Sequence, residues 1–175
     1  MRYYGCTAIA LATAIVASPT SYAGAQQYSA NLQGFNETPA ILSDGTGTFT
    51  LDLARTGENS GTATYTLTYS GLSSPATQGH IHFSKVHVAG GIIVWLCQTD
   101  AFPGPAGTPT CPAGGGTVTG TITAGSVVSI PAQLVPAGDF EALVDALRTN
   151  SAYANVHTTN APAGEIRGQI RGQDE

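Results

Sequence analysis

Two short motifs carry imidazoles at a spacing that suits metal binding. His80 and His82 are one residue apart, and His157 lies in a second motif near the C-terminus. Alternate side chains of a β-strand project from the same face about 6 to 7 Å apart, so a His-x-His pair in a strand can chelate an ion. Imidazole suits copper and zinc by its softness and geometry. The sequence therefore predicts a copper or zinc site at His80, His82 and His157, the alternative being that the three rings only hydrogen-bond to loop backbone.

Further polar residues could complete such a site. Asn155, Glu165 and Arg167 are expected on the side of the imidazoles, where they could orient the ligands or bind an anion. A cross-strand charge pair between Glu165 and Arg167 is the alternative. His87 follows a predicted bend and is either a fourth ligand or an exposed loop residue.

Strand parity decides which way these side chains point. Ile81 takes the core-facing side of its strand, so the histidines on either side of it point away from the core. Val156 takes the core side of its own strand, which turns Asn155 and His157 outward. We therefore expect the candidate residues on the outer surface of the sheet, beneath whichever loops fold over it.

Short segments of alternating apolar and polar residues, together with one continuous apolar run at 92–97, predict the strands that position these side chains. They cover residues 28–33, 48–53, 62–69, 79–83, 92–97, 118–122, 153–159 and 164–171. Residues 139–148 instead place their apolar side chains at helical spacing, with Asp139 as a suitable N-cap. The pattern predicts an all-β, antiparallel, Greek-key-like β-sandwich or flattened barrel of about 7–8 strands with one short helix near 139–148.

The N-terminal segment resembles a secretory signal. Arg2 precedes an apolar run from Cys6 to Ala17, and small residues follow near Ala23 and Ala25. The run is shorter than the roughly 18 to 20 residues that a membrane-spanning helix needs. We expect residues 1–25 to be a cleaved signal peptide and residues 26–175 to form a single domain, secreted or periplasmic, with no membrane span in the mature protein.

Charge and motif content exclude several function classes. The chain has six basic and eleven acidic residues, a net charge of −5, and its basic residues are scattered. Nucleic acid is therefore not an expected partner. The sequence has no nucleophile elbow, phosphate-binding loop or HExxH motif, which argues against hydrolase or transferase chemistry.

Cys97 and Cys111 are the two cysteines left once the predicted signal is removed. An even pair in an exported protein is most simply a disulfide. The Pro- and Gly-rich segment between them has no apolar periodicity, so a crosslink would help to order it. Binding of a metal ion by the two thiolates is the rival interpretation, which the absence of a Cys-x-x-Cys spacing does not favour.

These motifs resemble the CHRD domain, first recognised as repeats in chordin, and in particular an exported bacterial subgroup. The resemblance covers about residues 28 to 171. It is carried by Leu32–Glu37, Gly79–His82, Tyr153–Thr158, Gly164–Gln169 and the Leu96-Cys97 and Cys111-Pro112 pairs. His80, His82, His157 and Arg167 are also loosely similar to residue types around the metal of copper,zinc superoxide dismutases.

The resemblance implies an architectural role more than a reaction. We expect an exported, non-enzymatic module that binds copper or zinc through its outer-face histidines, serves extracellular interaction with an unknown protein, or does both. One alternative is a superoxide-dismutase-like copper oxidoreductase in which Arg167 attracts a small anion. Another is a purely structural or adhesive domain.

Overall fold

The computed structural model describes Met1 and residues 25–173. Apart from its two end residues, the predicted signal peptide lies outside the described residues. Nine strands are found in the part of the chain that the structure describes. They are β1 (Gln26–Gln33), β2 (Thr46–Gly57), β3 (Ser60–Ser70), β4 (Ala76–Phe83), β5 (Gly91–Cys97), β6 (Gly116–Ile122), β7 (Ala152–Thr158), β8 (Ile166–Gln169) and β9 (Arg171–Gly172).

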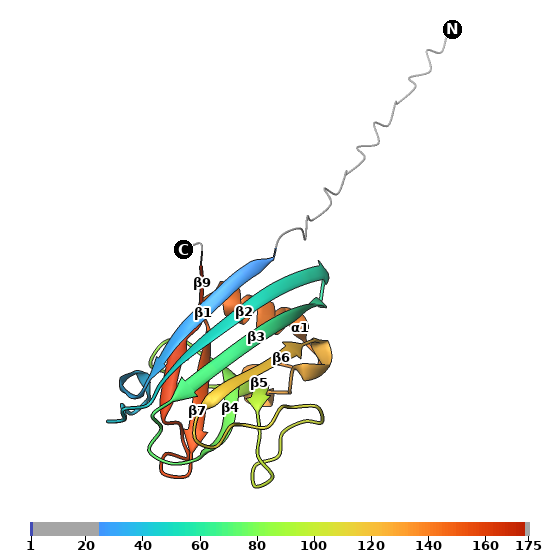
Figure 1. Cartoon of the computed structure of the whole chain (residues 1–175). Helices are drawn as coiled ribbons and strands as arrows, with labels where there is room; N and C mark the ends of the chain where they lie inside the picture. The colour runs from blue at the N-terminus through green and yellow to red at the C-terminus, as the bar shows by residue number, and fades with distance from the viewer. Residues whose placement is uncertain (2–24, 174–175) are drawn as a thin grey trace.

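The strands form one antiparallel sheet that curls into a nearly closed barrel (Figure 1). Its order is β5-β4-β7-β8-β1-β2-β3-β6, and β9 pairs with β1 beside β8. The two ends of this order, β5 and β6, lie next to each other without forming a ladder. The predicted all-β class is therefore confirmed, with an open seam between β5 and β6.

The helix α1 (Phe140–Arg148) lies where the apolar spacing predicts it. The side chain of Asp139 accepts a hydrogen bond from the Ala142 amide and caps the first turn. The helix packs against β3, β7 and β9. Short 3-10 turns also occur at Gly34–Asn36, Ala124–Ser126 and Pro131–Gln133. Among the described residues, no helix is long and apolar enough to cross a membrane.

The last predicted strand, 164–171, is two strands in the structure. The amide of Ile170 donates to the Ala152 carbonyl in β7, whereas Arg171 pairs with Ser29 of β1. Both strands pair with β1, but the ladder with β7 ends at Ile170, and this position divides β8 from β9. This division raises the strand count above the predicted seven or eight.

Burial differs between the two halves of the barrel. Residues of β2 and β3 alternate between buried and exposed, as the Thr-rich outer faces predict. Every residue of β7 is buried, and β4 is nearly so, because loops cover the outer face of these strands. The candidate residues lie on this covered face.

A disulfide joins Cys97 to Cys111, as predicted. It closes the loop of residues 98–110 at the end of β5. This loop runs along the seam, where it helps to form a pocket described below.

One side chain spans the seam and leads to a first prediction. The hydroxyl of Tyr65 in β3 donates to the Leu96 carbonyl of β5 at 2.6 Å. A net contribution of about 1 kcal/mol is typical of such a bond, so Tyr65→Phe should lower the free energy of unfolding by about that amount. Urea unfolding of the two proteins measures the difference, and an unchanged midpoint would show that the bond adds nothing to stability.

Candidate metal centre

The register of the sheet brings the predicted residues together. His80 lies opposite Trp95 of β5 on one side and Asn155 of β7 on the other, and Asn155 in turn lies opposite Arg167 of β8. His82 lies opposite Tyr153 in the next row. The outer face of β5, β4, β7 and β8 is therefore a continuous row of aromatic, imidazole, amide and guanidinium groups.

The three imidazoles form one cluster. The ring centroids of His80 and His157 are 4.9 Å apart, and those of His80 and His82 are 5.4 Å apart. Each histidine offers one ring nitrogen such that the three nitrogens lie within 4.8 Å of one another. The three rings therefore lie on one face of the sheet, as strand parity predicts, whereas Ile81 lies in the core.

The cluster is more enclosed than an outer sheet surface implies. His80, His82 and His157 are 0%, 7% and 6% exposed. The loop of residues 84–90 lies over His82, the turn of residues 159–164 lies over His157, and Trp95 packs edge-to-face on His80 at 4.3 Å. The expectation of covering loops was correct, and the extent of the cover goes beyond what parity alone predicts.

Hydrogen bonds fix the proton of two rings. His82 Nδ1 is 2.9 Å from the Gly90 carbonyl, and His157 Nδ1 is 2.9 Å from the Pro162 carbonyl. Because a carbonyl oxygen can only accept, both Nδ1 atoms carry hydrogen and both Nε2 atoms keep a lone pair. This backbone support of one ring nitrogen is the usual arrangement around metal-ligating histidines.

His80 lies between the other two rings. Its Nδ1 is 3.1 Å from His157 Nε2, to which it donates in the absence of an ion. Two ligands of one tetrahedral zinc ion are about 3.3 Å apart, so this pair has a suitable spacing for an ion that takes the place of the hydrogen on His80 Nδ1, with that ring then carrying its hydrogen on Nε2. Across the whole triad, the ligand nitrogens are up to 4.8 Å apart, which is wider than the zinc-ligand spacing. The rings must therefore turn toward one another to bind a single ion.

The surroundings keep the triad neutral. Burial, reinforced by His157 and His82, lowers the pKa of His80 to about 2. Burial also lowers the pKa of His82 to about 4, although its bond to Gly90 opposes the change. The pKa of His157 is lowered as well, again through burial. Neutral imidazole is the form that binds a metal, so no proton has to leave before binding at neutral pH.

Arg167 holds the covering loop in place. Its guanidinium stacks on the Tyr153 ring at 3.5 Å, and the Tyr153 ring in turn stacks on His82, with 4.7 Å between the ring centroids. Arg167 Nη2 also donates to the Val88 carbonyl at 2.7 Å. The guanidinium is thus buried and bonded to the protein, which differs from the expected role of attracting an anion.

Asn155 is held from the side of β8. Its Nδ2 donates to Glu37 Oε1 and more weakly to the Ile166 carbonyl. Glu37 is buried, and burial raises its pKa to about 7 against the opposing charge of Arg167. Glu37 entered the sequence argument only as part of a motif, since nothing in its own neighbourhood marked it as a site residue.

The structure does not bring Glu165 to the triad. Its carboxylate accepts hydrogen bonds from Ser43, Ser73 and Thr158 instead of pairing with Arg167. The reason is that β8 begins only at Ile166, so strand parity does not extend to position 165.

His87 is also separate from the cluster. It is exposed in the loop of residues 84–90, with a positive φ of 60°. The second of the two interpretations for this residue, an exposed loop histidine, is the one that agrees with the structure.

Sequence reasoning missed two aromatic residues of the site. Tyr153 shares the parity of Asn155 and His157, so its place beside His82 could have been found. Trp95 lies within a continuous apolar run, which hid its contact with His80.

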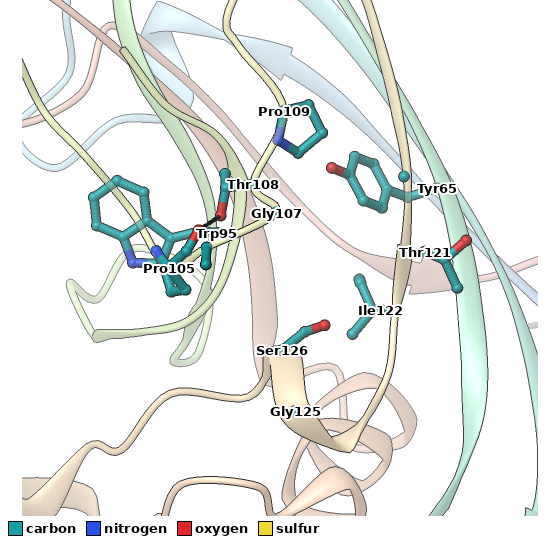
Figure 2. A pocket seen from close by; sticks show the side chains of 12 residues that line it. Tyr65, Trp95, Pro105, Gly107, Thr108, Pro109, Thr121, Ile122, Gly125 and Ser126 are labelled. Atoms are coloured by element: carbon teal, nitrogen blue, oxygen red, sulfur yellow. Dashed lines mark hydrogen bonds between the residues drawn. The ribbon is translucent and has the colours of Figure 1, made fainter. Parts of the chain in front are cut away.

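A separate pocket of about 260 Å³ opens at the seam between β5 and β6. Figure 2 shows Tyr65 and Trp95 on opposite sides of it, with the disulfide-closed loop along one wall. Its lining comes from Tyr65, Trp95 and residues 105–109, 120–122 and 125–126, all of them uncharged. Trp95 is thus shared between this pocket and the histidine cluster.

A comparison with family models finds one match, described as the CHRD domain, over residues 28–170. No curated protein and no solved structure matches the chain. The matched region contains most of β1 and all of β2 to β8, together with the three histidines, Glu37, Asn155 and Arg167.

Proposed function

Because the chain belongs to the CHRD domain family, we propose that it is an exported, non-enzymatic module that binds a copper or zinc ion through His80, His82 and His157. The observation that carries this proposal is the arrangement of ring nitrogens. The Nε2 lone pairs of His82 and His157, each set by a backbone bond on the opposite nitrogen, face a third imidazole in a buried cluster. The lone pair of His157 Nε2 accepts the hydrogen of His80 Nδ1, which a bound ion would replace. Such a donor set suits either metal.

The protonation states support the same proposal. The lowered pKa values keep the rings neutral well below physiological pH. Glu37 is hydrogen-bonded to Asn155, which lies beside the triad, and its carboxyl group can offset the charge of a bound cation. Arg167 is directed to the loop backbone, and so does not need to compete with the ion.

The test compares two histidine variants. The purified protein should bind one equivalent of Zn²⁺ or Cu²⁺ in calorimetry. His82→Ala or His157→Ala should lower the affinity at least ~100-fold, since even the loss of a residue that supports a ligand costs roughly 10- to 100-fold. His87→Ala is the matched control, because this exposed histidine lies outside the cluster and its loss should leave the affinity unchanged.

Two results would contradict the proposal. A wild-type protein that takes up neither metal would favour the structural or adhesive alternative. Equal binding by His82→Ala and the wild type would place the ion elsewhere.

The near-complete burial of the triad favours retention of an ion over turnover, since redox catalysis needs an open ligand position and access for the substrate. Decay of superoxide by the copper-loaded protein, above a free-copper control, would contradict the non-enzymatic part of the proposal. Interaction with an extracellular protein stays a prediction, which a pull-down with the histidine variants could separate from metal binding.

A further inference from the structure

Four buried side-chain acceptor atoms on the covered face lack a hydrogen-bond partner. They are His80 Nε2, His82 Nε2, Asn155 Oδ1 and Gln169 Oε1, and Gln169 lies one row away from His80 and Asn155, opposite Tyr153. A buried polar atom without a partner costs about 1–3 kcal/mol, so such atoms are rare and call for an explanation. The proposed ion bound by the three imidazoles explains His82 Nε2 but not the amide oxygen of Asn155.

The amide of Asn155 has a defined orientation. Its Nδ2 is turned toward Glu37 and toward Ile166 of β8. The strand on the other side of β7 is β4, and the residue of β4 directly opposite Asn155 is His80. Side chains of directly opposed residues are neighbours on the same face. Because Nδ2 is turned toward β8, Oδ1 is the amide atom on the side of β4 and the histidines.

From these observations we infer that Asn155 Oδ1 is a fourth ligand, and that the site binds a divalent ion of the Zn²⁺ class in a three-nitrogen, one-oxygen set. This inference rests on the proposed function. A neutral amide oxygen is a hard donor, which a four-coordinate Zn²⁺ accepts beside imidazole and which soft Cu⁺ does not favour. Asn155 thus becomes a direct ligand, where the sequence suggested only a residue that orients the ligands.

Glu37 gives this ligand its support. Its carboxylate accepts the amide hydrogen of Asn155, which orients the side chain and increases the negative charge on Oδ1. Gly164 lies against both groups, since a Cβ at this position would come within 2.5 Å of Asn155 Nδ2 and 2.6 Å of Glu37 Oε1. The close approach leaves little room for the amide to turn over.

The experiment uses the full purified chain with Zn²⁺, and with Co²⁺ as a spectroscopic probe. Asn155→Ala should lower the Zn²⁺ affinity roughly 10- to 100-fold and change the visible bands of bound Co²⁺. Asn31→Ala is the control. Asn31 is an exposed asparagine of β1 outside the histidine cluster, and its loss should leave both readouts unchanged.

An exchange variant keeps the inference testable if Asn155→Ala does not fold. In the double variant Glu37→Gln/Asn155→Asp, the amide and the carboxyl change places, so a hydrogen bond between the two positions is retained. The carboxylate at position 155 is then an anionic ligand. We expect Zn²⁺ affinity equal to or higher than that of the wild type, with shifted Co²⁺ bands.

The outcomes separate this inference from the proposed function. Wild-type affinity and wild-type Co²⁺ bands in Asn155→Ala, or unshifted bands in the exchange variant, would overturn the role of Asn155 and leave the histidine site intact. Binding of Cu⁺ but of neither Zn²⁺ nor Co²⁺ would also overturn the inference alone. A wild-type protein that binds no metal would overturn both.

Discussion

Replacing Glu165 with alanine is expected to lower the free energy of unfolding by about 4 kcal/mol or more, the largest effect of any single change considered for this protein. The carboxylate is fully buried. It accepts bonds from Ser43 Oγ at 2.6 Å, Thr158 Oγ1 at 2.6 Å, and both the amide and the hydroxyl of Ser73 at 2.7 and 2.8 Å. Bonds to a charged acceptor contribute about 1.5–3 kcal/mol each, and alanine would leave all four donors without it.

The expected loss is a large part of the total stability of a domain, which is about 5–15 kcal/mol. Glu165 connects the loop before β2, the loop before β4 and the end of β7, so its loss should loosen three segments that are distant in the sequence. Urea unfolding followed by circular dichroism measures the effect. Glu58→Ala, at an exposed turn, is the control and should stay within about 0.5 kcal/mol of the wild type. A similarly small change in Glu165→Ala would contradict the prediction.

The metal-free protein should lose stability steeply as the pH falls from 6.5 to 4.5. Histidines in the unfolded chain become protonated below pH 6.5, whereas the lowered pKa values of His80 and His82 keep both rings neutral in the fold. The unfolded state therefore binds more protons, so stability is present above pH 6.5 and is lost below it. His157, whose pKa is also lowered, adds to the loss.

Glu37 acts in the opposite direction over the same range. Its raised pKa of about 7 means that the folded state holds a proton that the unfolded state has released above pH 4.5. The unfolded state binds two or three more protons at the histidines and one fewer at Glu37, a net difference of one to two protons. The free energy of unfolding should therefore fall by about 1.4–2.7 kcal/mol for each pH unit. Urea midpoints at several pH values, in the presence of a chelator, measure this slope.

Glu37→Gln provides the internal check. It removes the opposing proton and should steepen the slope by about 1.4 kcal/mol per pH unit. Saturation with Zn²⁺ should shift acid unfolding to lower pH, because the ion competes with protons for the rings. A slope near zero in the metal-free protein would show that the rings are protonated in the folded state.

The sequence was sufficient for features that depend on local periodicity. Ile81 between two histidines fixes the direction of both rings, because a strand has a period of two. The helix at Phe140–Arg148 follows from its apolar stripe in the same way. The disulfide between Cys97 and Cys111 followed from the two cysteines that remain once the predicted signal peptide is set aside.

The sequence could not predict features that depend on loops. Residues 84–90 have no periodicity, so nothing indicated that their carbonyls would meet His82 and Arg167. Glu37 reaches Asn155 across more than a hundred residues, and such a contact leaves no pattern in either segment. Glu165 was misplaced because the chain enters its strand one residue later than the alternation suggested.

The loop of residues 84–90, which covers the histidines, is held mainly by hydrogen bonds to its main-chain atoms. His82 and Arg167 bond to the carbonyls of Gly90 and Val88, Gln169 bonds to that of Ser84, and the Gly90 amide bonds to Tyr153. The side chains at positions 86–89 point to solvent. The anchoring of the loop therefore does not depend on which side chains stand at these positions, which makes this short stretch a natural place to graft a label or a recognition peptide directly above the proposed metal site.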